Sequence, residues 1–324
     1  MVRDGVTRRA VLAGAALGAV APRARAADPF PSRTVTIVVP FAPGGGTDVL
    51  ARLLGRYLTT AWGHAVVVDN RAGASGKLGT EIVQRAAPDG HTLVMASTGA
   101  LMAVAGVERP FAVHEALAPV TLAAAPAYLV VVHPSLGVSD VAGLVAAAKA
   151  RPGAIDFGSS GVGSASHLVG ELFASTAGVE LVHVPYRGTG PAVNDLMAGR
   201  IGAMFAPPPT VAGAVRAGSL KVLGITSEAP SPLFPGVPPV SATLPGFSAV
   251  GWFGLLAPRG TPDEVTTAIQ RAVAHATETQ EVKERLAGLG AVPEPLTPAE
   301  FARYIDADVG KWQRLIRERG LTLE

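Results

Sequence analysis

The chain has 324 residues, of which 48% are hydrophobic and 5% aromatic, and it contains no cysteine. The lack of cysteine excludes disulfide bonds, thiolate metal sites, a cysteine nucleophile and a lipid-anchoring cysteine. Lysine and arginine number 27 and the acids 25, but residues 1–26 hold five arginines and one acid, so the rest carries about two net negative charges. This balance gives no indication of a nucleic-acid partner or of binding to an anionic membrane surface.

Residues 1–26 have the pattern of an export signal. The pair Arg8-Arg9 precedes an apolar stretch over residues 11–21, and Ala24-Arg25-Ala26 follows as a cleavage motif. The apolar stretch is too short for a membrane-spanning helix, which needs roughly 20 residues. We predict cleavage near Ala26 and export to the periplasm. The arginine pair fits the twin-arginine route, a general secretory signal has a similar pattern, and a basic start to a cytosolic protein is the remaining alternative.

The chain after the signal alternates short β-branched runs with amphipathic stretches, a pattern typical of βαβ units on mainly parallel sheets. Aliphatic residues outnumber aromatic ones, which favours aliphatic α/β packing. In the first half we expect strands at 35–39, 65–68 and 92–96, and helices over 48–62 and 79–87.

A second block of the same kind follows. Ser139-Asp140 is a helix-capping pair and Pro152-Gly153 a helix stop. We expect strands at 128–132, 155–158, 181–184 and 220–226, and helices over 141–150, 167–176 and 192–198. The proline-rich residues 230–245 indicate an irregular excursion or a crossover.

The C-terminal part is predicted to be helical over 263–289 and 298–319. Each stretch begins with a threonine cap, a proline and an acid in the first turn. The length after the signal is near the point where one hydrophobic core gives way to two lobes. Two α/β lobes joined by two crossovers suit a clamshell, although periodicity alone does not assign the C-terminal helices to either lobe.

Three loops share one design, in which a strand ends, small residues turn the chain and a helix begins. They cover residues 41–48, 159–167 and 186–191. Glycines let the backbone approach a ligand, and the free N–H groups of a helix N-terminus favour an anion. Such loops gather at the carboxyl ends of parallel strands, where ligands bind. Together they predict a site for an anion or carboxylate.

Individual residues of these loops have a second interpretation. The three glycines at 44–46 also suit a simple tight turn. Asp48 fits an N-terminal helix cap better than a ligand group, because it would repel a carboxylate. His167 at a helix start fits a hydrogen-bonded structural residue better than a catalytic base. Tyr186 suits a pocket wall and a core position equally.

No enzyme motif is complete. The glycine loop at 44–47 lacks the Gly-Lys-Ser/Thr of a P-loop, and there is no dinucleotide fingerprint and no nucleophile elbow. The seven histidines are scattered without metal-binding spacing. Ser164 and Ser166 lie next to His167, but adjacency in sequence does not make a triad, so a hydrolase is a minor alternative. We expect binding without chemistry, no metal and no cofactor.

Motifs along the whole chain resemble those of the solute-binding receptors of tripartite tricarboxylate transporters, the Bug receptors. The resemblance spans about residues 30–320. Its motifs are PSR at 31–33, VVPFAPGGGTD at 38–48, VVDNRAGA at 67–74, APDGHTL at 87–93, SHLVGELF at 166–173, VHVPYRG at 182–188, WFGLLAP at 252–258 and Gly-Thr-Pro at 260–262.

The resemblance implies an α/β, two-domain periplasmic-binding-protein clamshell of the type II-like kind. The first domain would take residues 27–125 and 228–324, and the second residues 126–227. Such a receptor captures a small organic carboxylate for membrane permease subunits, and we expect it to act as a monomer. A ligand sensor that serves a membrane two-component kinase uses the same clamshell and is the alternative function.

By motif, the resemblance places ligand contacts on all three loops and on one further strand end. The expected contacts are Phe41, Ala42, Gly45, Gly46, Thr47, Ser97, Thr98, Ser160, Gly163, Ser164, His167, Tyr186 and Gly188. The sequence departs from the family pattern after Phe205, where Ala206 replaces an acidic or amide residue. Residues 99–114 are also atypical, and we assign no contacts to them.

Overall fold

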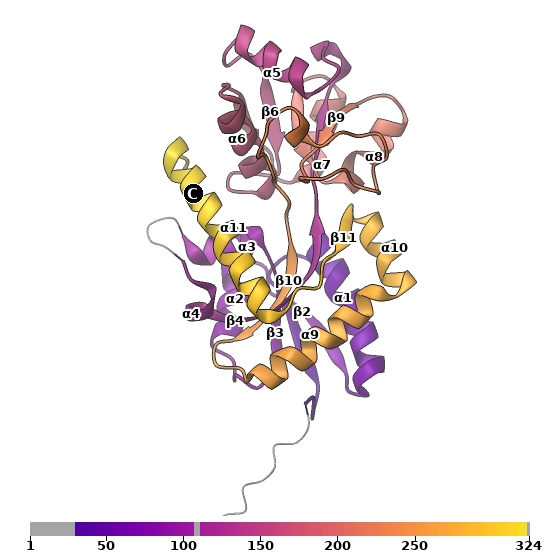
Figure 1. Ribbon diagram of the computed structural model, residues 1–324, viewed down its shortest axis with the longest axis vertical. Coiled ribbons are helices and arrows are strands. Elements are labelled where there is room, and N and C mark those ends of the chain that lie inside the picture. Colours follow the sequence, from indigo (N-terminus) through magenta and orange to yellow (C-terminus); the bar gives the residue numbers. More distant parts are fainter. Residues whose placement is uncertain (1–29, 107–110, 323–324) are drawn as a thin grey trace, which may run out of the picture.

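The computed structural model describes residues 30–106 and 111–322 and shows two α/β lobes, each built on its own sheet (Figure 1). The predicted export signal and its cleavage site lie outside the described residues. The clamshell architecture expected from the sequence is therefore confirmed. Among the described residues, no helix is long and apolar enough to cross a membrane.

The first lobe holds a six-stranded sheet in the order β11-β4-β10-β3-β1-β2. Strands β1, β2 and β3 run parallel, whereas β10 lies antiparallel between β3 and β4, and β11 pairs with β4 at the edge. The strands are β1 (Val35–Val39), β2 (Val66–Asn70), β3 (Thr92–Ser97), β4 (Leu117–Pro126), β10 (Phe253–Pro258) and β11 (Ala291–Pro293).

Helices from both ends of the chain cover this sheet. They are α1 (Gly46–Trp62), α2 (Lys77–Gln84), α3 (Thr98–Ala105), α4 (Val113–Ala116), α9 (Asp263–Glu278), α10 (Gln280–Gly288) and α11 (Pro298–Arg319). In α1 the fully buried side chains of Leu50, Leu54 and Leu58 recur at every fourth position and face the sheet. Each such side chain contributes about 1.5–3 kcal/mol relative to exposure. Helix α1 ends at Gly63, whose φ of 67° is in the left-handed region.

The second lobe holds a five-stranded sheet in the order β7-β6-β8-β5-β9. Its strands are β5 (Leu129–Val132), β6 (Asp156–Ser159), β7 (Val182–Pro185), β8 (Ala203–Ala206) and β9 (Lys221–Ile225), and its helices are α5 (Val141–Ala150), α6 (Ala165–Ala177), α7 (Thr189–Met197) and α8 (Pro208–Arg216). The rings of Phe157, Phe173 and Phe205 pack together in its core. Strand β5 is antiparallel to both neighbours, because it enters from the first lobe.

The chain crosses between the lobes twice, and the two crossovers lie side by side. The amide of Gly251 donates to the carbonyl of Pro126 at 2.9 Å, and the amide of Thr226 donates to the carbonyl of Tyr128 at 2.9 Å. Residues 127 and 250 also form a bridge. Paired crossovers of this kind are where a clamshell bends.

The C-terminal helix α11 makes a third connection. It packs mainly on the first lobe but extends beside α6 of the second (Figure 1). At its end, Nε of Arg319 lies 3.0 Å from Oε2 of the buried Glu171 in α6. The ion pair therefore ties the two lobes together in this conformation.

Most elements occur where the sequence predicts them, with three kinds of difference. The helix expected over 263–289 breaks at Thr279, whose side chain accepts from the amide of Val282 and caps α10. Strands β4, β8, β10 and β11 were not predicted, because they are short or rich in alanine and proline. Helices α3, α4 and α8 also had no clear periodic signal. Residues 230–245 are irregular, as predicted, apart from one 3₁₀ turn at Val240–Ala242.

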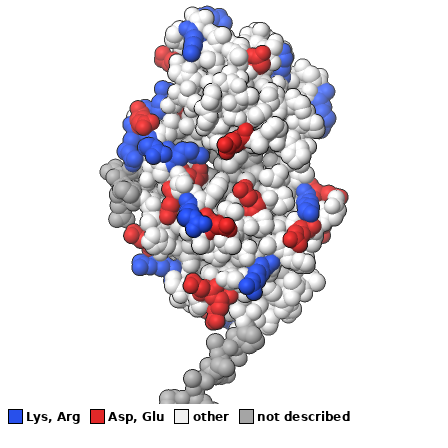
Figure 2. All heavy atoms as spheres, in the orientation of Figure 1, with Lys and Arg blue, Asp and Glu red and all other residues white. Residues whose placement is uncertain are grey.

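Charged side chains of both signs are interspersed on the face that Figure 2 shows, and neutral side chains cover much of the upper lobe. No group of three or more potential metal ligands occurs in the part of the chain that the structure describes. Neither observation indicates a charged partner beyond those expected from the sequence.

Candidate ligand-binding site

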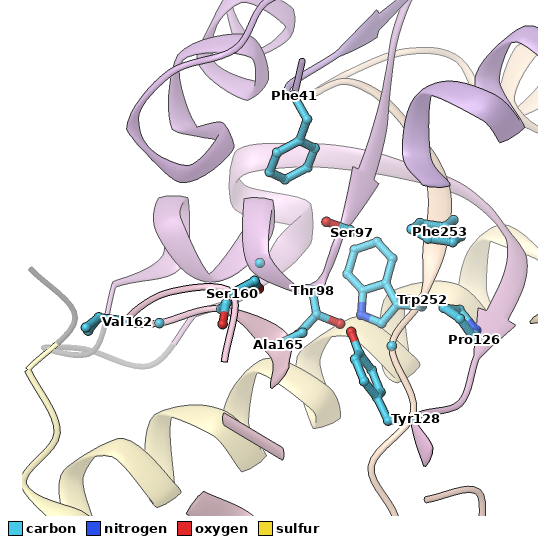
Figure 3. Close-up of a pocket in the computed structure, with 14 residues that line it drawn as sticks. Phe41, Ser97, Thr98, Pro126, Tyr128, Ser160, Val162, Ala165, Trp252 and Phe253 are labelled. Carbon is cyan, nitrogen blue, oxygen red and sulfur yellow. The ribbon is translucent and has the colours of Figure 1, made fainter. Parts of the chain in front are cut away.

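A cavity of about 330 Å³ lies between the lobes, with the crossovers at its side (Figure 3). This volume is near the lower end of the range of roughly 300–1,000 Å³ for small-molecule sites. Residues of both lobes and of both crossovers line it. They are Phe41, Ser97, Thr98, Gly99, Pro126, Tyr128, Ser160, Val162, Gly163, Ser164, Ala165, Gly251, Trp252 and Phe253.

The first lobe contributes the N-terminus of α3 to the cavity. Strand β3 ends at Ser97, which has an extended backbone and makes no side-chain hydrogen bond to the helix. The first amides of α3 therefore lack a capping side chain, and Thr98 and Gly99 line the cavity. An uncapped helix N-terminus carries roughly half a positive charge and favours an anion.

The second lobe contributes the N-terminus of α6, which is capped by the side chain of Ser164. Oγ of Ser164 accepts from the amide of His167 at 3.3 Å and donates to the carbonyl of Gly161 at 2.6 Å. Oγ of Ser166 accepts from the amide of Ser160 at 3.0 Å. These bonds hold the loop at 159–167 in one shape and place Ser160 and Ser164 at the cavity wall.

A buried carboxylate behind the first-lobe wall connects three elements. Asp308 of α11 is 6% exposed, and its Oδ2 accepts from the indole N–H of Trp252 at 2.9 Å and from Oγ1 of Thr98 at 3.4 Å. Its Oδ1 accepts from the indole N–H of Trp312 at 2.9 Å and lies 3.1 Å from Nζ of Lys311. Asp308 thus orients two side chains of the cavity without lining it.

Four aromatic residues from three segments line the cavity: Phe41, Tyr128 and the adjacent pair Trp252-Phe253, of which Trp252 is only 1% exposed (Figure 3). The antiparallel ladder between β3 and β10 places Phe253 opposite Ser97. The ring of Phe253 lies against Gly46, where a Cβ atom would be 3.0 Å from the ring. A side chain at position 46 would therefore move this ring by a few tenths of an ångström.

His167 belongs to a cluster behind the second-lobe wall and does not line the cavity. Its Nδ1 accepts from the amide of Gly163 at 3.1 Å, and its ring stacks on His183 with 3.8 Å between centroids. Nε2 of His183 lies 2.6 Å from Oγ of the fully buried Ser159. Burial lowers the pKa of His167 to about 4, and burial together with the neighbouring His167 lowers the pKa of His183 to about 4. These contacts agree with the structural role expected for His167.

Asp48 likewise supports a loop. It is the third residue of α1, is 3% exposed and accepts from the amide of Gly44 at 2.9 Å and from the side-chain amide of Asn70 at 2.9 Å. Arg52 pairs with it at 3.0 Å. Burial opposes ionisation, but hydrogen bonds from Arg52, Gly44 and Asn70 hold the pKa of Asp48 below its usual value. The carboxylate fastens the glycine turn at 44–46 from within the first turn of α1. The N-cap of α1 is Gly45 and no side chain caps it, so Asp48 supports the loop but is not the helix cap expected from the sequence.

The structure brings six of the thirteen predicted contacts to the cavity. These are Phe41, Ser97, Thr98, Ser160, Gly163 and Ser164. Ala42, Gly45, Gly46, Thr47, His167, Tyr186 and Gly188 do not line it. The hydroxyl of Tyr186 donates instead to Asp195 at 2.9 Å, and burial, together with that bond, raises the pKa of Tyr186 to about 12. Ligand contact by any of the thirteen residues stays a prediction.

Several lining residues were absent from the sequence prediction, notably those on the crossovers. Pro126, Tyr128 and Gly251 carry no local signal of a site, whereas Trp252-Phe253 belongs to a motif that pointed to the family but not to a contact. Ala206, which departs from the family pattern, is fully buried in β8 opposite Leu129 and does not line the cavity.

Comparison with known proteins identifies the family. A family model described as "Tripartite tricarboxylate transporter family receptor" matches residues 50–321. The chain belongs to this family. Protein BugT of Bordetella pertussis is 38% identical over 92% of this chain and 93% of its own length. A protein of Pseudomonas sp. (strain P51) from the tcbD-tcbE intergenic region is 39% identical over 97% of this chain and 95% of its own. As a member of a receptor family, this chain is a solute-binding protein and not an enzyme.

Solved structures of similar proteins support the fold. Rpa4515 of R. palustris with adipate is 32% identical, with a TM-score of 0.74 over 90% of this chain and 99% of that one. MatC of Rhodopseudomonas palustris with bound malate is 31% identical, with a TM-score of 0.73 over 89% and 100%. The periplasmic binding protein BugD is 29% identical, with a TM-score of 0.73 over 90% and 99%.

Proposed function

We propose that this chain is a periplasmic receptor that captures a small organic carboxylate and presents it to the permease subunits of a tripartite transporter. The observation that carries the proposal is the interlobe cavity, into which the uncapped N-terminus of α3 opens. None of the fourteen described residues that line this cavity is acidic. The similar receptors with adipate and malate support a carboxylate as the ligand class.

Binding would act through closure of the lobes. A ligand held by Ser97 and Thr98 on one lobe and by Ser160 and Ser164 on the other contacts both lobes only when they are close. It therefore favours the closed state by its higher affinity for that state. We propose domain boundaries near residues 126 and 227, and we propose that the receptor acts as an exported monomer with the signal removed near Ala26.

The test is calorimetric titration of the mature chain, residues 27–324, with mono-, di- and tricarboxylates, and with neutral amides as controls. Saturable binding of a carboxylate without product formation supports the proposal. Binding of neutral or cationic compounds alone would overturn the carboxylate assignment while leaving the receptor fold intact.

A pair of variants at Ser97 tests the position of the carboxylate. Ser97→Asp places a negative charge at the N-terminus of α3, where it caps the helix but repels a bound anion. Ser97→Asn caps in the same way without the charge. We expect Ser97→Asp to lose at least roughly tenfold more affinity than Ser97→Asn, since one unfavourable charge contact of about 1.4 kcal/mol corresponds to tenfold. Equal affinities would place the carboxylate elsewhere in the cavity.

A further inference from the structure

An ion pair joins the two lobes outside the cavity. Arg319 lies in the last turn of α11, on the first lobe, and Glu171 lies in α6, on the second. Nε of Arg319 is 3.0 Å from Oε2 of Glu171, and the two side chains are 32% and 6% exposed. Neither residue lines the cavity. Water screens a pair with one buried partner less than a pair on the surface, so this contact is stronger than an ordinary surface ion pair.

On the second lobe, Glu171 belongs to the helix that forms the cavity wall. Helix α6 begins at Ala165, which lines the cavity, and Glu171 lies about 9 Å further along the same helix at 1.5 Å per residue. The buried ring of His167 lies between them. Its Nδ1 accepts from the amide of the cavity residue Gly163 at 3.1 Å, and its Nε2 lies 3.8 Å from Oε1 of Glu171. The cavity wall and Glu171 therefore move together.

On the first lobe, α11 is fastened to the helix that forms the opposite wall. Oγ1 of Thr98, in the first turn of α3, donates to Oδ2 of Asp308 at 3.4 Å. At the other end of α3, the side-chain amide of Gln313 donates to the carbonyl of Gly106 at 2.8 Å. Helices α3 and α11 are thus held together at two points, and they form one body that carries Arg319.

A ligand and the ion pair connect the same two bodies. A ligand between the lobes joins the N-terminus of α3 to that of α6, and Arg319 joins α11 to α6 at a second point (Figure 1). Separation of the lobes breaks both connections and exposes the carboxylate of Glu171 to water. Two contacts that form only in the closed state strengthen one another, because each raises the population of the state that the other requires.

We propose that Arg319 and Glu171 latch the lobes in the closed state and thereby slow the release of the ligand. Both are positioning residues, since they act on the ligand through α6 and do not line the cavity. The effect on ligand release rests on the proposed function, whereas the effect on the lobes is independent of any ligand.

The first experiment measures the separation of the lobes in the ligand-free mature chain. The chain has no cysteine, so Thr176→Cys in α6 and Arg303→Cys in α11, both at exposed positions, provide two unique sites for spin labels. Pulsed electron paramagnetic resonance gives the distance distribution between the labels. Arg319→Gln should shift this distribution to longer distances, because α6 then moves away from α11. Arg319→Lys keeps the charge and should largely restore the native distribution, and Arg314→Gln, at an exposed position on the same helix, is the matched control.

The second experiment measures the release of adipate and malate by stopped-flow tryptophan fluorescence. We expect Arg319→Gln to release a bound acid about tenfold faster, an effect between those of exposed and buried pairs, and to change the association rate by less than about threefold. Glu171→Gln, the second variant, should accelerate release less, because it leaves no unpaired charge in the closed state. The double variant should release the acid no faster than Arg319→Gln alone, because either substitution breaks the same contact.

The outcomes separate the latch from the proposed function. An unchanged label distance or an unchanged release rate in Arg319→Gln, or an equal acceleration in Arg314→Gln, overturns the latch and leaves the carboxylate receptor standing. A longer label distance in Arg319→Gln without saturable binding of any carboxylate supports the latch and overturns the proposed function.

Discussion

Replacing Asp308 by asparagine tests whether this carboxylate organises the cavity from behind. In the native chain its two oxygens serve two indole N–H groups on opposite sides, from Trp252 and Trp312, each at 2.9 Å. Asparagine has the same shape but only one oxygen. Its amide nitrogen must therefore face one of the two indole N–H groups, donor against donor, and the charge that attracts Lys311 disappears.

The expected loss of stability follows from these contacts. A hydrogen bond to a charged group contributes about 1.5–3 kcal/mol, and a buried donor without a partner costs about 1–3 kcal/mol. We therefore expect Asp308→Asn to lose about 3 kcal/mol of the free energy of unfolding. At about 2.1 cal/mol/K of unfolding entropy per residue, a chain of this length loses about 1.6 °C of Tm per kcal/mol, so we expect a fall of about 5 °C.

The assay is thermal unfolding of the mature chain followed by tryptophan fluorescence, with ligand affinity measured on the folded variant. Glu318→Gln, an exposed acid on the same helix, is the matched control and should change stability by no more than about 0.5 kcal/mol. Ligand affinity should also fall, because Thr98 and Trp252 line the cavity. A loss below about 1 kcal/mol with unchanged affinity would refute the organising role of Asp308.

Two further predictions concern packing and pH. Gly79→Ala should lower the free energy of unfolding by about 1–3 kcal/mol, because the added Cβ would lie 2.8 Å from two backbone atoms. Gly310→Ala, with open space around it, is the control and should raise the free energy of unfolding by about 0.5–1 kcal/mol. Chemical denaturation measures both values, and equal effects would contradict this reasoning. The unfolded chain protonates His167 and His183 near pH 6.5, whereas the folded chain does so only near pH 4, so stability should fall as the pH drops through this window. Tm measured against pH should fall less steeply in His183→Gln, and an identical slope would show that this pair does not cause the loss.

Much of the secondary structure could be predicted from local patterns. Strand β1 and helices α5 and α11 lie where β-branched runs, caps and stop signals place them, since these signals act within a few residues of the chain. The strands that were missed are those whose extended state depends on neighbours. Strand β10 is held between β3 and β4, and β4 has alanines and prolines that lack β propensity of their own.

The sequence by itself determined the α/β class, the family resemblance and the serine loop at 159–167 that forms the second-lobe wall of the cavity. Only the tertiary structure decided which residues meet there. Tyr128 and Trp252 are far apart in the chain and come together because the crossovers pair, and Asp308 reaches Thr98 because α11 packs beside α3. Local sequence patterns predict the secondary structure of each segment. A cavity depends on long-range packing between segments, which no local pattern describes.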